Sequence, residues 1–168
     1  HDADIVHHLA GITDVPRVKS EASVEKEKKI KIVAEEGTQN ILDVINDNCK
    51  IIMPSTHVVY EGTNEVRKDI LENEETCPVL AYGKSKDYNE KQLKNSGKKF
   101  IIIRLGSVYG YSTDTARIDI MANFFSKMTS QNGILKLFGG GRQLKSLVPL
   151  IDVARCFKFM EEKSTINS

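Results

Sequence analysis

The sequence predicts an α/β fold in which helices cover both faces of a parallel sheet, a doubly wound arrangement. Two observations lead to this fold class. Apolar runs of strand length, such as the one in KFIIIRLG (99–106), are continuous and do not alternate with polar residues, which is typical of strands buried on both faces. Longer charged segments with helical periodicity separate these runs, as in chains that cross from one parallel strand to the next.

The N-terminal half is expected to hold two strands and one long helix. Residues 5–9 resemble a short strand, and a charged helical segment covers 18–47. Apolar residues that could form the buried face of this helix are Ile30, Val33, Ile41, Leu42 and Ile45. A second strand over 51–53 is expected to stop at Pro54, because proline cannot donate to a sheet ladder. An irregular acidic loop follows over 61–77.

The C-terminal half is expected to hold two more strands and three helices. A helix over 79–95 should end at Ser96-Gly97, ahead of the strand in 99–106. The segment GILKLFGGG (133–141) predicts a short strand closed by three glycines, and IDVARCFKFMEE (151–162) predicts the last helix. The remaining helix carries the apolar residues Ile118, Ile120, Met121, Phe124, Phe125 and Met128.

The composition is that of one globular domain with a substantial core. The chain has 168 residues, of which 40% are hydrophobic and 28% charged, with a net charge of +1. This charge gives no general attraction to nucleic acid or to anionic membranes, and the apolar runs are too short to span a bilayer. Cys49, Cys77 and Cys156 are far apart and odd in number, which favours a reducing compartment over a disulfide framework or zinc site. We therefore expect a cytoplasmic protein without a metal site.

Small residues follow three of the predicted strands. They are Ala10-Gly11, Pro54-Ser55-Thr56 and Gly106-Ser107. In open parallel sheets, ligands bind beyond the carboxyl ends of the strands, where small residues let a ligand approach the backbone closely. Any one of these segments could equally be a tight turn, but together they favour a binding crevice.

Tyr82 and Lys86, in YGKSK (82–86), are candidates for acid–base chemistry. Four residues apart on a helix, their side chains share one face. A neighbouring ammonium group favours the phenolate form of a tyrosine, whose ordinary pKa of about 10 is too high for a base at neutral pH. A hydroxyl such as that of Thr56 could orient the phenol or the reacting oxygen. On the pentapeptide alone, an exposed tyrosine on a lysine-rich helix is the simpler interpretation.

The wider sequence changes this interpretation. The segments HLAG, GTQNILD, IIMPSTHVVYEG, YGKSK, IIIRLGSVYG and LVPLIDVAR occur in this order between residues 4 and 159. In order and spacing they resemble the extended short-chain dehydrogenase/reductase family. Its best-known members are NAD-dependent nucleotide-sugar epimerases and dehydratases. The resemblance implies a Rossmann-like sheet, a homodimer formed through the helices at 18–47 and 79–95, and NAD as cofactor, with NADP not excluded.

The resemblance also implies residue roles. Tyr82 would be the catalytic acid/base, Lys86 would lower its pKa and bind the nicotinamide ribose, and Thr56 would be the third catalytic residue. Residues implied to bind the cofactor are Leu9, Ala10, Gly11, Pro54, Ser55, Tyr82, Lys86, Gly106 and Val108. Residues implied to bind substrate are Thr56, His57, Ser107, Leu137 and Lys145. Glu61 is a further candidate acid/base, whereas His7 and His8, on opposite faces of a strand, are expected to serve packing.

Some residues depart from the family pattern. Ala34 replaces a common asparagine, Lys145 a common arginine, and Ser107 the asparagine of NVYGP. Lysine lacks the bidentate fork with which arginine binds a diphosphate. No G-x-x-G-x-x-G turn occurs, and most of a C-terminal substrate domain is not recognisable. We therefore expect residues 1–168 to be part of an NAD(P)-binding domain, incomplete at its N-terminus, with about 132–151 bordering the substrate-binding region.

The function expected from this resemblance is epimerisation or dehydration of a nucleotide-activated sugar by transient hydride transfer. An NAD(P)-dependent ketone reductase of the same fold is an alternative. A non-catalytic binding protein that retains the fold is a second alternative, suggested by Ala34 and Lys145.

Overall fold

The computed structural model describes residues 2–13, 23–63, 65–113 and 117–163. The chain divides into two compact units: His1–Arg104 with Met160–Ser168, called here the first unit, and Leu105–Phe159, the second unit. The elements that begin in the first unit are β1 (Ile5–His7), α1 (Val24–Val44), β2 (Lys50–Thr56), the 3-10 helix η2 (His57–Tyr60), α2 (Ala81–Asn95) and β3 (Lys99–Leu105). The second unit contains β4 (Ser107–Tyr109), α3 (Met121–Ser130), the 3-10 helix η3 (Phe138–Gly141), β5 (Leu147–Pro149) and most of α4 (Leu150–Glu162).

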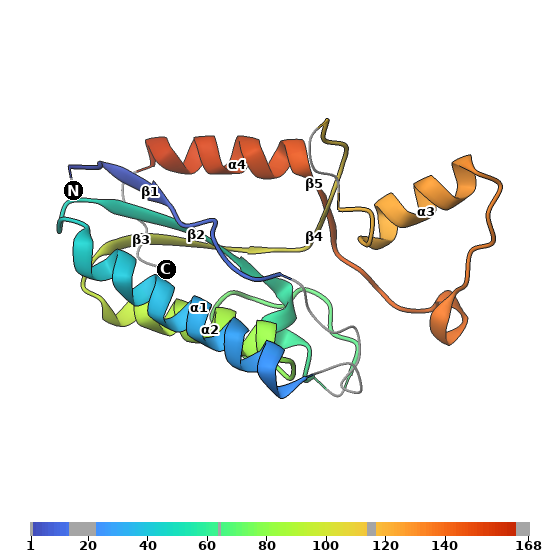
Figure 1. Ribbon diagram of the computed structural model, residues 1–168, viewed down its shortest axis with the longest axis horizontal. Helices are drawn as coiled ribbons and strands as arrows, with labels where there is room; N and C mark the ends of the chain where they lie inside the picture. Colours follow the sequence, from blue (N-terminus) through green and yellow to red (C-terminus); the bar gives the residue numbers. More distant parts are fainter. Residues whose placement is uncertain (1, 14–22, 64, 114–116, 164–168) are drawn as a thin grey trace. The chain divides into compact units, whose positions relative to one another are not determined.

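The sheet of the first unit has the strand order β1-β2-β3. β1 runs parallel to β2, with Ile5 opposite Lys50 and His7 opposite Ile52. α1 and α2 lie side by side against one face of this sheet (Figure 1). The parallel α/β fold predicted from the sequence is therefore confirmed.

The hydrophobic core of the first unit lies between the sheet and these two helices. Its buried members are Leu42, Ile45, Cys49, Ile51, Met53, Leu93 and Phe100. The predicted buried face of α1 is correct for Ile30, Leu42 and Ile45, but Val33 is 40% exposed. The polar Thr38 is buried in α1 instead. The N-terminal part of the predicted helix, 18–22, lies outside the described residues.

The two helices begin and end through local interactions. The Ser23 hydroxyl accepts a hydrogen bond from the Lys26 amide and caps α1. α2 ends at Asn95, and Gly97 follows with φ +71°, as the Ser96-Gly97 pair predicted.

Pro54 does not end β2, contrary to the prediction. The strand continues to Thr56. The main-chain oxygen of Ile52 accepts a hydrogen bond from the His8 amide, so the main-chain polar groups of Ile52 point toward β1. Those of Pro54, two residues later, point to the same side, but β1 has already ended at His7. The missing N–H of Pro54 therefore faces no strand partner and interrupts no ladder.

In the second unit, β4 pairs in parallel with β5, with Val108 opposite Val148. Neither three-residue strand is evident in the sequence pattern. A Cβ added to Gly106 would lie 2.7 Å from the main-chain oxygen of Ser146. Glycine at this position therefore lets the two segments approach each other just before β4 and β5 pair. The strand predicted within 133–141 is wrong: within that range the only regular element is η3. Ile134 is 83% exposed, so its apolar side chain does not belong to a buried strand.

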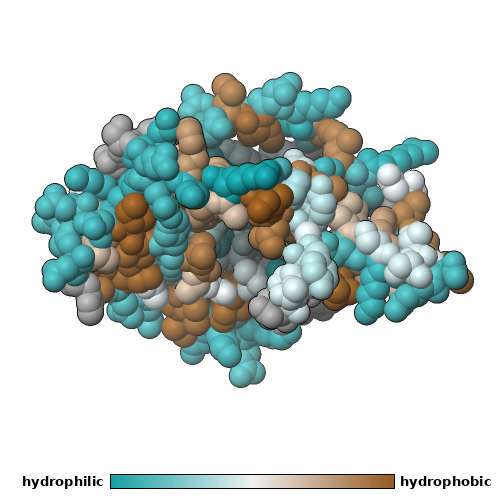
Figure 2. Space-filling view, turned by 90° about the horizontal axis from the view of Figure 1, so that it is seen from above, coloured by the Kyte–Doolittle hydropathy of each residue, from teal (hydrophilic) through white to brown (hydrophobic). Residues whose placement is uncertain are grey.

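Apolar side chains on the surface occur in small groups. On the face seen in Figure 2 they are interleaved with hydrophilic residues. Those along α4 include Leu150, Ile151 and Phe159. None of the helices in the described part of the chain is both long enough and apolar enough to cross a bilayer.

Candidate active site at the end of β2

The carboxyl end of β2 and the first turns of α2 are held in close contact. The Thr56 hydroxyl is buried and accepts a 3.3 Å hydrogen bond from the Val58 amide, which caps η2. A Cβ on Gly83 would lie 3.2 Å from the Val58 oxygen and 3.1 Å from Cβ of Pro78. Glycine at this position therefore lets α2 approach η2 more closely than another residue would.

Lys86 joins α2 to β2. Its side chain is buried, with the residue only 9% exposed, and its ammonium group donates a 3.0 Å hydrogen bond to the Pro54 oxygen. Burial lowers the pKa of Lys86, whereas the nearby carboxylate of Glu90 raises it. The lysine thus lies next to the strand end at which the sequence predicts a ligand.

Tyr82 lies one helical turn before Lys86 and is half-buried. Its main-chain oxygen accepts a 2.8 Å hydrogen bond from the Ser85 hydroxyl. The spacing of Tyr82 and Lys86 within α2 places their side chains on one face of the helix. A phenol beside an ammonium group can act as a proton acceptor and donor.

A buried ion pair lies next to the end of β2. Arg104 of β3 donates through Nε to Oε1 of Glu90 at 3.0 Å and through Nη2 to Oε2 at 2.6 Å. The Ser55 hydroxyl donates to the same carboxylate at 2.5 Å. Arg104 also donates to the Tyr60 hydroxyl and lies over its ring, 5.1 Å from the ring centre. Burial raises the pKa of Tyr60, and the Arg104 charge lowers it.

Sequence reasoning missed Glu90 and Arg104. Two signals could have indicated them. Glu90 lies one turn after Lys86 on α2, and Arg104 interrupts the apolar run of β3. A charge in an otherwise buried strand requires a partner.

His8, at the end of β1, is buried as predicted. Its Nε2 lies 2.8 Å from the Thr38 hydroxyl, and its Nδ1 is a buried atom without a hydrogen-bond partner. Burial lowers the pKa of His8, and the positive charge of Lys86 lowers it further. Glu61, considered above as an acid/base, accepts hydrogen bonds from the Val79 and Leu80 amides at 2.9 and 2.6 Å. Its carboxylate thus holds the chain that enters α2.

The other predicted site residues differ in their surroundings. Leu9, Ala10 and Gly11 are exposed beyond the end of β1, and His57 is half-buried at the start of η2. The remaining predicted residues belong to the second unit: Gly106, Ser107, Val108, Leu137 and Lys145. In that unit the Ser107 amide donates to the Ser146 oxygen at 2.7 Å, whereas Leu137 and Lys145 are exposed.

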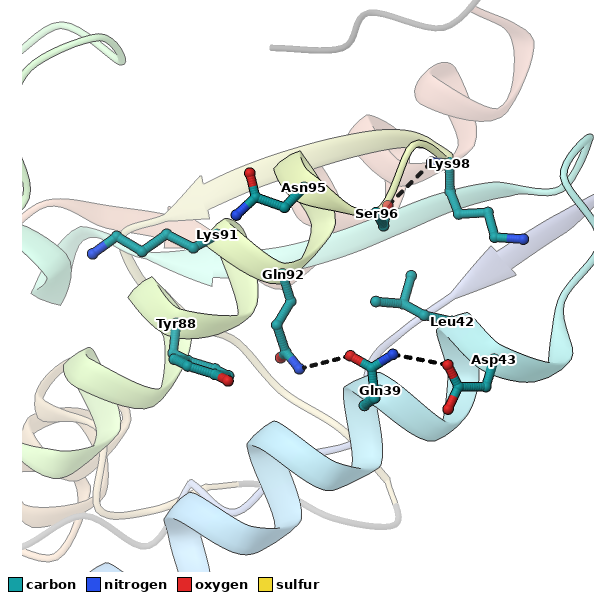
Figure 3. A pocket seen from close by; sticks show the side chains of 9 residues that line it. All are labelled: Gln39, Leu42, Asp43, Tyr88, Lys91, Gln92, Asn95, Ser96 and Lys98. Carbon is teal, nitrogen blue, oxygen red and sulfur yellow. Dashed lines mark hydrogen bonds between the residues drawn. The ribbon is translucent and has the colours of Figure 1, made fainter.

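A pocket of about 500 Å³ lies between α1 and α2 (Figure 3). Within it, Gln92 donates to Gln39 at 3.4 Å, and Gln39 donates to Asp43 at 2.8 Å. The pocket is lined by Gln39, Leu42, Asp43, Tyr88, Lys91, Gln92, Asn95, Ser96 and Lys98. None of these is a predicted site residue, and their polar contacts are typical of the surface between two helices. Among the described residues, no group of three or more His, Cys, Asp or Glu side chains is arranged to hold a metal ion.

Comparison with known proteins shows the family. Residues 1–135 match the family described as RmlD substrate binding domain. A curated protein of Methanocaldococcus jannaschii, described as "Putative UDP-glucose 4-epimerase", is 32% identical over 127 residues, which are 71% of this chain and 41% of that protein. The chain therefore belongs to the RmlD substrate binding domain family, of the short-chain dehydrogenase/reductase type, as the sequence motifs predicted.

Solved structures share the fold. The UDP-glucuronic acid 4-epimerase of Bacillus cereus, in complex with UDP-glucuronic acid and NAD, is 25% identical, with a TM-score of 0.77, over 96% of this chain and 50% of that one. A UDP-glucose 4-epimerase of Thermotoga maritima with UDP-glucose is 23% identical, also with a TM-score of 0.77, over 96% of this chain and 52% of that one. The chain thus spans about half the length of the solved structures and less of the curated relative.

Proposed function

We propose that this chain carries the acid–base residues of an NAD(P)-dependent epimerase or dehydratase that acts on a nucleotide-activated sugar. The observation that carries the proposal is the position of Lys86: buried, hydrogen-bonded to the Pro54 oxygen at the carboxyl end of β2, and one helical turn after Tyr82. The similarity to UDP-sugar 4-epimerases supports the same reaction class.

The residues present fit the nicotinamide-ribose end of such a cofactor. An ammonium group has three donors, of which Lys86 directs one to Pro54, and a ribose hydroxyl is a suitable acceptor for another. Leu9, Ala10 and Gly11 would line the cofactor's path, since they are exposed and a Cβ on Gly11 would have no neighbour within 4 Å. A glycine-rich turn of the kind that binds a pyrophosphate does not occur in this sequence. Lys86 and residues 9–11 would therefore bind only the nicotinamide-ribose end of the cofactor.

In the proposed mechanism, Tyr82 accepts the proton of the sugar hydroxyl and later returns it. The bound cofactor would supply the acceptor for the hydride. The ammonium group of Lys86 would favour the phenolate form of Tyr82, and Thr56 would orient the reacting oxygen. His57, Ser107, Leu137 and Lys145 would contact the substrate, with Lys145 offering a point charge to its phosphates.

The proposal includes a homodimer formed through α1 and α2. Exposed apolar side chains on these helices support it: Ile32, Val33 and Val44 on α1 and Tyr88 on α2. Light scattering coupled to size-exclusion chromatography of the full-length protein tests it. A mass equal to one chain at micromolar concentration would contradict the dimer.

Tyr82→Phe in the full-length protein, assayed with UDP-sugars and NAD, tests the function. We expect turnover to fall at least about 100-fold, because the phenol that moves the proton is lost. Tyr88→Phe, which removes the same atom from an exposed tyrosine of the same helix, should retain turnover. Equal turnover by both variants would contradict the acid–base role of Tyr82. No turnover by the unsubstituted protein would contradict the enzyme hypothesis and favour a binding protein. Repeated turnover without consumption of added cofactor separates an epimerase or dehydratase from a reductase.

A further inference from the structure

Glu90 is the most deeply buried charged residue of α2. The residue is 1% exposed and lies one turn after Lys86 on the same face of the helix. A buried carboxylate is costly unless it is paired and hydrogen-bonded, so its partners indicate what it holds in place.

Those partners lie on two strands. The Ser55 hydroxyl of β2 and Nε of Arg104 in β3 both donate to Oε1 of Glu90, at 2.5 and 3.0 Å. Nη2 of Arg104 donates to Oε2 at 2.6 Å, and Nζ of Lys94 lies 4.0 Å from that atom. One carboxylate therefore connects α2 to the central strand and to β3.

The contact with Ser55 connects Glu90 to the candidate site. Ser55 lies between Pro54, whose oxygen binds the ammonium group of Lys86, and Thr56, whose hydroxyl caps η2. The chain from Pro54 to Thr56 is thus fixed at its centre by Glu90, while Lys86 and Glu90 project from one helix. A shift of Ser55 would move both the acceptor of Lys86 and the Thr56 hydroxyl.

We propose that Glu90 is a positioning residue of the candidate active site, which through Ser55 fixes the end of β2 and through its charge keeps Lys86 an ammonium ion. The contribution of Glu90 to catalysis rests on the proposed function, but its effect on the charge of Lys86 does not. The direction of the electrostatic effect agrees, since burial lowers the pKa of Lys86 and Glu90 opposes this. Lys86 also faces His8 from β1, and Glu90 also faces Arg104 from β3.

The test is Glu90→Gln in the full-length protein, which keeps the shape of the side chain and removes its charge. Asp87→Asn is the matched control, because Asp87 is a buried carboxylate of the same helix that pairs with Thr76 and Lys91 and not with β2. The acylation of Lys86 by acetic anhydride, measured by mass spectrometry relative to the exposed Lys84, reports the neutral amine without any need for activity.

We expect Glu90→Gln to raise the relative acylation of Lys86 at pH 7 by about threefold or more, because a neutral amine reacts and a nearby anion favours the ammonium form. Asp87→Asn should leave it unchanged. In a UDP-sugar assay, Glu90→Gln should lower kcat with little change in KM. It should also move the basic limb of the pH profile, where Lys86 loses its proton, to lower pH, because the carboxylate that raises the pKa of Lys86 is gone. Equal acylation in the two variants would overturn the proposal.

If Glu90→Gln does not fold, Ser55→Ala decides, because it removes only the link to β2 and keeps the pair of Glu90 with Arg104. Because the Glu90 charge stays, relative acylation can rise only if the end of β2 moves and weakens the hydrogen bond of Lys86 to Pro54. We expect a rise of about twofold, and an unchanged value would overturn the proposal that Glu90 positions this strand end through Ser55. If the unsubstituted protein turns over no UDP-sugar, the proposed function fails, while the acylation result still stands for or against the role of Glu90.

Discussion

The ammonium group of Lys86 donates a 3.0 Å hydrogen bond to the main-chain oxygen of Pro54, at a point of β2 beyond the end of the neighbouring strand β1. The lysine occupies the place that a ladder partner would take on that edge. A proline at this position leaves a carbonyl acceptor and no competing N–H donor. The residue that was expected to end the strand thus supplies the acceptor that anchors Lys86.

Replacing Lys86 with Met should separate function from stability. The change removes the ammonium group together with the cost of its burial, so the free energy of unfolding in urea should change by no more than about 1 kcal/mol. Turnover of a UDP-sugar by the full-length protein should fall about 100-fold or more. Lys84→Met, at an exposed position of the same helix, should affect neither. A loss of turnover that accompanies unfolding would argue instead for a structural lysine.

Two helical glycines should respond oppositely to alanine. A Cβ on Gly37 in α1 has no neighbour within 4 Å, so Gly37→Ala should stabilise the protein by about 0.5–1 kcal/mol through helix propensity. Gly83→Ala gains the same propensity but presses on the Val58 backbone and on Pro78, and should destabilise by about 1–2 kcal/mol. Urea unfolding compares the two. Stabilisation by both would mean that η2 moves away from α2 at little cost.

The sequence predicts the first unit well because its elements are long and its apolar runs are continuous. β3 and the end of α2 follow directly from KFIIIRLG and from Ser96-Gly97. β4 and β5 have three residues each and are defined by their pairing, which periodicity cannot indicate. The segment at Ile134 misleads because it is apolar and yet exposed, and it forms no strand.

The candidate site can be predicted only in part from the sequence. Tyr82, Lys86 and Thr56 belong to a recognisable pattern of residue types and spacing. Glu90 and Arg104 are ordinary charges until the fold brings their side chains together within 2.6 Å. Burial of a charge depends on tertiary pairing, so the sequence alone does not distinguish Glu90 from an exposed helical glutamate.

His8 should make stability depend on pH below neutrality. Because its pKa in the folded state is lowered from 6.5, the unfolded chain binds the proton more tightly. The stability that depends on a neutral His8 is therefore fully present above pH 6.5, and it is lost as the pH falls through the pKa of His8 in the folded protein. His8→Gln should reduce the slope of unfolding free energy against pH by at most one proton, about 1.4 kcal/mol per pH unit. Urea unfolding at several pH values below 6.5 measures this slope, and an identical slope in both proteins would contradict the prediction.

Lys50 should stabilise the protein through the C-terminal end of α4. Its ammonium group, on the buried first residue of β2, donates to the main-chain oxygens of Met160, Glu161 and Lys163 at 2.9, 2.6 and 2.9 Å. The last turn of α4 has no basic residue of its own, so a lysine from another element supplies the cation that a helix C-terminus favours. Lys50→Met should lower the free energy of unfolding by about 2 kcal/mol, as expected for hydrogen bonds to a charged group.

The matched control for Lys50 is Lys99→Met, at the exposed first position of β3, which should change the free energy of unfolding by no more than about 0.5 kcal/mol. Hydrogen exchange distinguishes the cause: in Lys50→Met, the amides around residues 160–163 should exchange faster, because fraying begins where the carbonyls lose their donor. If the loss of stability were spread evenly over the first unit instead, the lysine would act through packing of its aliphatic stem and not through the helix terminus.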